Sequence, residues 1–531
     1  MGVAGDALRP HPQGGDHALL LHTRGSLRSC LRHVRAFHGP RGLGGLERTG
    51  PCHPGGLRAP PLRPLRRVPL RREHAVQAAR LAAVGFGLVG ALSCTGLPEI
   101  HYQRKPPAPG AKVTMENAQG AVAKGKAEAL LGRHPGDSRA GTRERALLEE
   151  AATGRPLLAG NAVQLLFDGP ETMGAMRASI SAAKRTINLE TYIFDQDELG
   201  RAFSDLLIAK QREGVQVNII YDCVGTAGTP EAFFDRMREA GIRLCPYHPL
   251  NPFKRLGRWK INNRDHRKIL VVDGAVAFTG GANISGTYLH GSLFRSKGRG
   301  RTNLGWRDTH LRIEGPAVAA LQELFAQTWR VQMKEDLHTP DYFPVAQEAG
   351  DTLVRVVGSQ PGSDFEIYRA YVLAIDQATR SIHLTAAYFV PDAQIVRALV
   401  RAARRGVEVE IILTSVTDSG FVQYASQSYY QEFLEAGARL YQLKSSILHA
   451  KTAVIDGAWS TVGSTNLDMR SFLFNKEVNV IVLGTPFGGE MERAFREDKA
   501  NSDEITLAAW SRRSRADRVR EWFARRLAWW L

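Results

Sequence analysis

Two stretches of the chain carry the same set of polar residues. Residues 265–285 read DHRKILVVDGAVAFTGGANIS, and residues 448–466 read LHAKTAVIDGAWSTVGSTN. Each has a His, a Lys two places later, an Asp five places after that, and an Asn behind a small-residue turn. The members are His266, Lys268, Asp273 and Asn283, and their counterparts His449, Lys451, Asp456 and Asn466. A single His-x-Lys is common by chance, but two such extended copies in one chain indicate a shared chemical role.

The residue types in these sets favour chemistry on a phosphodiester. On a strand, residues i and i+2 point the same way, so each His and its Lys are expected to face one ligand. Lysines and the Asn283 and Asn466 amides suit the charge that grows on phosphoryl oxygens during displacement. A neutral imidazole is a competent nucleophile, and a protonated one can donate to the leaving alkoxide. No cluster has metal-ligand spacing, so we expect neither a metal nor a cofactor.

Each histidine needs a carboxylate on its second nitrogen to hold the reactive tautomer. The segments WRDTHLRIEG and NKEVNVIVLG follow the two polar sets and look like equivalent strands. They contain Asp308 and Glu477, which we expect to orient the histidines. Asp273 and Asp456 stand at the far ends of the motif strands, which favours a structural role as acceptors for turn amides.

The order of expected elements also repeats. Strands and helices alternate from about residue 159, and the same order returns from TLVRVVGS onward; FFDRMREAGIRLCPY aligns with YYQEFLEAGARLYQL without a gap. This pattern predicts an α/β fold built by internal duplication. A chain of 531 residues also exceeds what one core usually accommodates. Two equivalent domains related by pseudo-twofold symmetry would bring the two polar sets face to face.

The remaining segments differ in composition. Of the net charge of +17, +10 lies in residues 1–80, so the high overall charge is weak evidence for nucleic-acid binding. We expect the following organisation: 1–75 a disordered Arg/Pro-rich segment, 76–97 an apolar membrane anchor or signal-like segment, 98–158 a polar linker, 159–340 and 341–505 the two domains, and 506–531 a basic Trp-rich helix. Cys94 ends a sequence that loosely resembles a lipoprotein cleavage box, so a lipid on Cys94 is the alternative anchor.

The doubled motif resembles that of the phospholipase D superfamily. NRDHRKILVVDG, WRDTHLRIEGPAV, LHAKTAVIDGAWSTVGSTNLDMRSF and NKEVNVIVLG resemble its bacterial cardiolipin synthases. The resemblance implies two duplicated phospholipase D-like α/β domains, each a mixed sheet flanked by helices, with the active site at the pseudo-twofold interface. It implies that the His, Lys and Asp of both motifs form the catalytic set. His266 would be the nucleophile and His449 the general acid and then base, although the near-symmetry leaves the reverse assignment open.

Three functions fit these residues. The first is a phosphatidyltransferase that forms cardiolipin and glycerol from two phosphatidylglycerols through a phosphohistidine. The second is a phospholipase D hydrolase with water as acceptor, and a phosphodiester nuclease ranks third. The expected partners are an anionic glycerophospholipid and a membrane surface, with no nucleic acid and no obligate protein partner. The expected location is the bacterial cell membrane, through the apolar segment or Cys94. The synthases commonly begin with two spanning helices, whereas we find at most one apolar segment in this sequence.

Overall fold

The computed structural model describes residues 97–100, 112–132, 139–249, 262–288, 305–363, 365–416 and 420–528. The segment expected at 1–75, residues 76–96 of the expected anchor, and Cys94 lie outside these ranges. Within them, none of the helices combines the length and the apolar character that crossing a bilayer requires. The prediction that the protein is attached to the cell membrane through its N-terminal segment is therefore corrected: the structure gives it no support.

The first half of the duplicated fold starts at β3 and ends with α7. Its elements are β3 (Leu157–Phe167), α4 (Gly169–Ala182), β4 (Thr186–Thr191), α5 (Glu198–Arg212), β5 (Gln216–Asp222), α6 (Glu231–Glu239), β6 (Arg243–Tyr247), β7 (Arg264–Asp265), β8 (Ile269–Val272), β9 (Val276–Gly280), the 3₁₀ turn η2 (Gly286–Tyr288), β10 (Trp306–Arg307), β11 (Thr309–Glu314) and α7 (Ala317–Met333).

The second half repeats this order and adds elements at its end. It contains β12 (Thr352–Ser359), α8 (Glu366–Gln377), β13 (Ser381–Ala386), β14 (Phe389–Val390), α9 (Ala393–Arg404), β15 (Glu408–Thr414), α10 (Gly420–Gln427), α11 (Tyr430–Glu435), β16 (Arg439–Leu443), β17 (Ile447–Leu448), β18 (Lys451–Ile455), β19 (Trp459–Gly463), β20 (Leu467–Asp468), α12 (Met469–Leu473), β21 (Asn475–Leu483), α13 (Thr485–Ala500), β22 (Ser502–Ile505), α14 (Leu507–Ser511) and α15 (Arg515–Leu527). The domain boundary predicted at 340/341 falls between α7 and β12.

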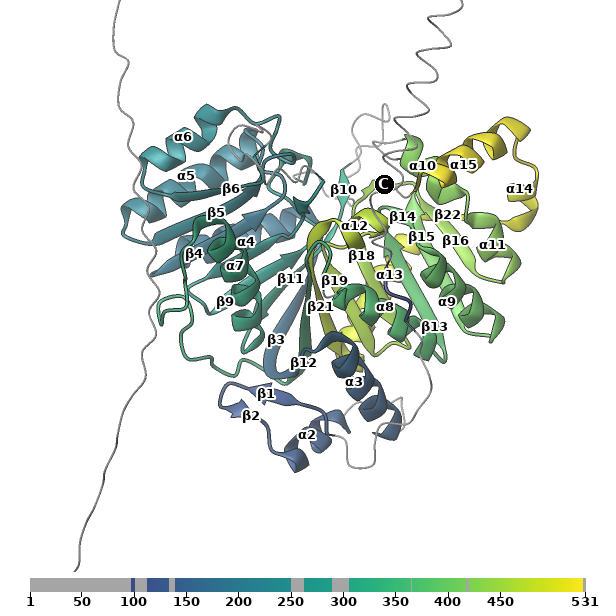
Figure 1. The fold of residues 1–531 in the computed structure, drawn as a ribbon, viewed down its shortest axis with the longest axis horizontal. Helices are drawn as coiled ribbons and strands as arrows, with labels where there is room; N and C mark the ends of the chain where they lie inside the picture. The colour runs from purple at the N-terminus through teal and green to yellow at the C-terminus, as the bar shows by residue number, and fades with distance from the viewer. Residues whose placement is uncertain are drawn as a thin grey trace, which may run out of the picture. The chain divides into compact units, whose positions relative to one another are not determined.

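Both halves contribute to one mixed sheet. The strand order through it is β6-β5-β4-β8-β9-β11-β3-β12-β21-β19-β18-β13-β15-β16-β22. Read outward from the β3–β12 pair, the strands on the two sides are equivalent in the same order, apart from the additional β22 at one edge. A duplicated fold is expected to show this symmetry. Figure 1 shows first-half strands in blue and teal meeting second-half strands in green and yellow along this pair.

Helices cover both faces of the sheet because the apolar residues of its strands point both ways. Ile219 on β5 belongs to the core that contains Phe203 of α5, whereas the next residue, Ile220, packs in the core of Phe325 and Trp329 of α7. This alternation is the period of two expected for a strand buried on both faces. The core under the junction of the halves draws valines from β12 and β21 together with residues of α7.

Part of the segment expected as a polar linker, 98–158, is folded. It contains β1 (Met115–Asn117), β2 (Gly120–Ala121), α2 (Lys124–Leu131) and α3 (Arg139–Thr153). Strand β1 extends the sheet beside β3, and α3 packs against α8 of the second half. Glu149 of α3 forms a fully buried ion pair with Arg355 of β12. The high content of charged and small residues concealed this packing because several of the charges are paired internally.

Candidate active site

The two motif histidines enter one cavity from opposite halves. His266 lies between β7 and β8, and His449 lies between β17 and β18. Both side chains line a cavity of about 380 Å³, together with Asn283 and Asn466. The structure therefore brings the histidine and the asparagine of both polar sets to one cavity.

The backbone of each histidine is held by the other half. Strand β7 pairs with β21, and the His266 amide donates to the Lys476 carbonyl at 2.9 Å. In the same way β17 pairs with β10, and the His449 amide donates to the Arg307 carbonyl at 2.8 Å. Each histidine is thus fixed by a short strand that crosses to the opposite half of the fold.

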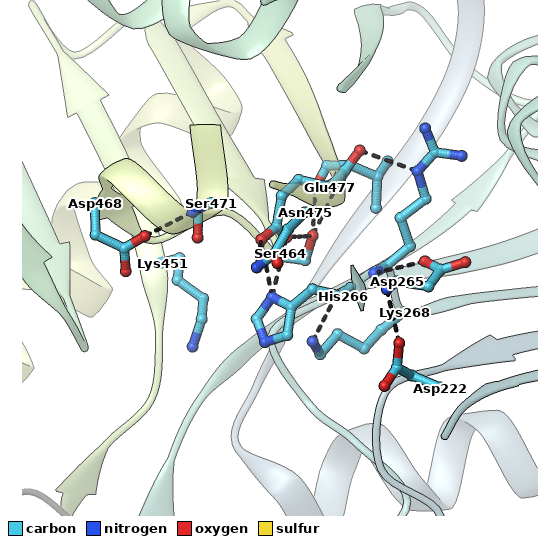
Figure 2. A network of polar contacts seen from close by, with 12 residues as sticks. Asp222, Asp265, His266, Lys268, Lys451, Ser464, Asp468, Ser471, Asn475 and Glu477 are labelled. Atoms are coloured by element: carbon cyan, nitrogen blue, oxygen red, sulfur yellow. Dashed lines mark hydrogen bonds and ion pairs between the residues drawn. The ribbon is translucent and has the colours of Figure 1, made fainter. Parts of the chain in front are cut away.

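The carboxylate that orients each histidine also comes from the opposite half of the fold. His266 Nδ1 lies 3.0 Å from Glu477 Oε2, and Figure 2 shows this contact. His449 Nδ1 lies 2.7 Å from Asp308 Oδ2. A ring that donates from Nδ1 to a carboxylate keeps the lone pair on Nε2, the nitrogen that nucleophilic attack requires. The structure therefore places each predicted acid on the histidine of the other half.

Burial sets the protonation of these pairs. It lowers the pKa of His266, with Lys268 adding to the effect and Glu477 opposing it. Burial and Lys451 lower the pKa of His449 to about 4, against the opposing effect of Asp308. Burial acts to raise the pKa of both acids, but the adjacent histidines and lysines outweigh it and hold each pKa below its ordinary value. At neutral pH each of these two pairs therefore consists of an ionised carboxylate and a neutral imidazole.

The motif lysines are buried beside their histidines. Lys268 Nζ donates to the His266 carbonyl at 2.6 Å, and Lys451 Nζ donates to the His449 carbonyl. Burial lowers the pKa of Lys268 to about 7. A buried ammonium recovers its charge most readily when an anion binds next to it, which suits a phosphoryl site.

The two motif asparagines differ in their contacts. Asn283 accepts from the Ile193 amide at 3.2 Å and donates to Tyr288 Oη at 3.2 Å. Asn466 Oδ1 is buried with no hydrogen-bond partner among the described residues. Asn283 is therefore fixed by its surroundings, whereas the acceptor Asn466 Oδ1 has no such contact.

Asp273 and Asp456, included in the catalytic set by resemblance, do not line the cavity. Asp273 accepts from the Lys184, Arg185 and Thr186 amides at 2.7–2.9 Å. Asp456 accepts from the amides of residues 379–381 at 2.7–3.1 Å. Both carboxylates stabilise the turn before a central strand, and the backbone of both residues has a positive φ of about 55°. Their catalytic assignment is corrected to the structural role that their position favours.

Sequence reasoning missed most of the cavity wall. The wall includes the aromatic residues Tyr192, Trp306 and Tyr388 and the arginines Arg264 and Arg470. Some of these residues adjoin the motifs, as Trp306 does in WRD and Arg264 in NRDH. Tyr192 and Tyr388 follow β4 and β13, and Arg470 lies on α12, so their approach to one cavity becomes visible only in the folded chain.

Comparison with known proteins agrees with this geometry. Residues 176–293 and 371–499 match the family described as cardiolipin synthase, PLD-like domain. A cardiolipin synthase of Geobacillus kaustophilus is 37% identical over 377 residues, which cover 70% of this chain and 73% of that protein. The chain belongs to the cardiolipin synthase family. The matched segments of this family, one in each half, confirm the predicted α/β fold of two duplicated phospholipase D-like domains.

Two further matches support the family assignment and the fold. A cardiolipin synthase of Listeria welshimeri is 36% identical over 364 residues, covering 68% of this chain and 73% of that protein. The solved phosphatidylserine synthase of Haemophilus influenzae superposes with a TM-score of 0.57 at 14% identity, covering 72% of this chain and 99% of that one. Membership in the cardiolipin synthase family confirms the prediction of a phosphatidyltransferase of the phospholipase D superfamily.

Proposed function

We propose that the protein forms cardiolipin and glycerol from two molecules of phosphatidylglycerol through a phosphohistidine. One observation carries the proposal: imidazoles from the two halves open on one cavity, each bonded through Nδ1 to a buried carboxylate. This arrangement leaves two Nε2 atoms for a single phosphorus, one to attack and one to move a proton.

In the first step, Nε2 of His266 attacks the phosphorus of the donor lipid and forms a P–N bond. The P–O bond to the glycerol headgroup breaks, and His449 Nε2–H gives its proton to that oxygen. Glycerol leaves, and the phosphatidyl group remains on His266. Lys268, Lys451 and Nδ2–H of Asn466 donate to the non-bridging oxygens and stabilise the charge that gathers there.

In the second step, a hydroxyl of another phosphatidylglycerol gives its proton to His449. Its oxygen forms a new P–O bond to the phosphorus as the P–N bond to His266 breaks. Cardiolipin leaves, His266 is neutral again, and His449 is protonated for the next cycle. In hydrolysis, water would replace the lipid hydroxyl and phosphatidic acid would be the product.

The proton on His449 depends on the substrate. In the free protein the His449 pKa of about 4 leaves the ring neutral. A phosphodiester bound beside it adds a negative charge, and a nearby anion raises the pKa of an imidazole. We therefore propose that lipid binding itself converts His449 to the proton donor, which ties acid catalysis to an occupied site.

The anionic lipid is proposed to reach the site at a membrane surface that α15 contacts. Val519, Trp522 and Phe523 of α15 are 66%, 59% and 58% exposed, and Arg526 lies over the Trp522 ring. Exposed aromatic residues among arginines suit an anionic lipid interface. Helix α15 packs on α10, whose Val422 lines the cavity.

Replacing Trp522 and Phe523 together by Ser is expected to reduce cosedimentation with phosphatidylglycerol vesicles; unchanged cosedimentation would contradict this contact.

The deciding assay uses the purified full chain and phosphatidylglycerol vesicles. The proposal expects cardiolipin and glycerol in equal amounts. Phosphatidic acid as the sole lipid product would instead assign hydrolysis to the same site. Because two lysines supply the positive charge, activity is expected to persist in EDTA; its loss would overturn the metal-independent chemistry.

A further inference from the structure

Asp468 introduces a carboxylate into the cavity that holds the two histidines. It ends β20, two residues after Asn466, and lines the cavity with 7% of its surface exposed. Its Oδ1 accepts from the Ser471 amide at 2.7 Å, a contact that Figure 2 shows. Among the described residues that line this cavity, Asp468 supplies the one carboxylate; Arg264 and Arg470 also line it, and Arg264 is paired with Asp222.

A negative side chain is unexpected next to the position of an anionic phosphodiester, because like charges repel more strongly in a buried site than in water. The contact with Ser471 does not explain the charge. Ser and Asn cap a helix about as well as Asp does, and neither carries a charge. At the equivalent position of the first half, where ANIS aligns with TNLD, the residue is the neutral Ser285.

A carboxylate needs hydrogen-bond donors, and hydroxyl groups are the donors of a glycerol headgroup. One carboxylate offers about four acceptor positions, and the Ser471 amide occupies one of those on Asp468. Burial raises the pKa of Asp468 to about 6, so the group is largely ionised at neutral pH. A charged acceptor binds a hydroxyl more strongly than a neutral acceptor does.

We propose that Asp468 accepts a hydrogen bond from a hydroxyl of the glycerol headgroup and thereby selects polyol headgroups over alcohols with one hydroxyl. This inference rests on the proposed transfer reaction and assigns its headgroup specificity. The leaving glycerol and the incoming headgroup pass through the same position, because the second step reverses the first. Asp468 is thus a specificity-determining residue on the second-half side of the cavity, with no acidic counterpart at Ser285.

The test compares two soluble acceptors with one donor lipid. The concentration of phosphatidylglycerol is held constant in both assays. One assay follows the exchange of labelled glycerol into phosphatidylglycerol, and the other follows the conversion of ethanol to phosphatidylethanol. The variant Asp468→Asn keeps the cap on α12 and the side-chain size but removes the charge. We expect its ratio of kcat/KM for glycerol to kcat/KM for ethanol to fall about tenfold, mainly through KM for glycerol.

The matched control is Asp197→Asn, since Asp197 caps α5 by accepting from the Gly200 amide at 2.9 Å and does not line the cavity. Its acceptor ratio should stay within twofold of wild type. An unchanged ratio in Asp468→Asn, or an equal loss with both acceptors, would overturn the role of Asp468. A wild-type protein that makes neither cardiolipin nor labelled phosphatidylglycerol would instead overturn the proposed function.

Discussion

The surroundings of His266 and His449 differ although the backbone around them is duplicated. The ring centroids of Tyr192 and His266 lie 4.9 Å apart in a T-shaped arrangement. Glu477 receives further hydrogen bonds from Ser464 Oγ and Asn475 Nδ2. The His449 ring has Trp306 at 5.0 Å, and its Nδ1 lies 3.2 Å from Tyr288 Oη. The position of Trp306 in one half is that of Asn475 in the other. Duplication therefore preserved the histidine, lysine and acid while the neighbouring positions diverged.

A second lesson concerns what the two halves share. Each acid orients the histidine of the other half, and further contacts cross in the same way. Arg307 of the first half pairs with Asp498 of the second at 2.8 Å. Lys476 of the second half donates to Thr328 of the first at 2.9 Å. Neither half contains a complete histidine site, so the chemistry belongs to the junction.

The largest expected effect comes from removing either histidine. His266→Ala and His449→Ala should each lower kcat for cardiolipin formation by more than about 10⁴-fold, because attack and proton transfer act on one phosphorus. The double variant should be little worse than either single one. Measured turnover with phosphatidylglycerol vesicles checks this, and substantial activity in either single variant would show that the halves work separately.

Removing the crossed acids should have the next largest effect. Glu477→Gln and Asp308→Asn are each expected to reduce kcat by about 10²- to 10³-fold, since the ring loses its orienting acceptor. Glu477 raises the pKa of His266, so Glu477→Gln should lower the pKa of His266 further. NMR titration of the two rings measures this directly. A larger shift at His449 than at His266 would contradict the crossed pairing.

The charge on Lys268 gives a smaller, pH-dependent effect. Its pKa of about 7 means that the ammonium is charged below that pH and neutral above it. Sulfate keeps its charge over this range, so its affinity should fall about three- to tenfold between pH 6.5 and 8.5. Calorimetry at constant ionic strength measures the change.

Two variants calibrate the sulfate titration. Lys268→Met should bind sulfate weakly and with little pH dependence. Lys444→Met removes a half-exposed lysine that pairs with Asp503, and it should behave like wild type. A pH dependence that survives in Lys268→Met would assign the titration to another group.

The smallest effect should separate the two motif aspartates. Asp456 also forms an ion pair with Arg145 of α3 at 2.9 Å. The described contacts of the Asp273 carboxylate include no equivalent ion pair. Asp456→Asn should therefore reduce the free energy of unfolding by about 1–2 kcal/mol more than Asp273→Asn. Chemical denaturation of both variants measures the difference, and equal losses would show that the Arg145 contact adds no stability.

The contacts of Asp456 with Arg145 and the turn amides also predict a pH dependence of the free energy of unfolding. Backbone amides and Arg145 outweigh burial and hold the pKa of Asp456 below its ordinary value. A depressed pKa stabilises the folded state above the unfolded pKa of about 4. The stability that Asp456 contributes should disappear as the pH falls through its folded pKa, and Asp456→Asn should remove this part of the acid dependence.

The sequence predicted the duplicated fold because strand and helix periods repeat in the same order in both halves. It predicted Asp308 and Glu477 because they occupy equivalent strands, but sequence alone could not pair each with the histidine of the other half. The packing of 98–158 onto the two halves was not predicted because its charges, such as Glu149, are paired with residues about 200 positions away. The role of Asp468 was missed because it becomes visible only when the cavity is closed by both halves.

The central claim is that both histidines serve one phosphorus and that His266 forms the covalent bond. The most direct measurement is rapid quenching of the wild-type reaction with phosphatidylglycerol into alkali, where phosphohistidine survives, followed by peptide mass spectrometry. We predict a phosphatidyl adduct on His266 that is absent from His266→Ala. An adduct on His449, or steady turnover with no adduct on either histidine, would contradict the account.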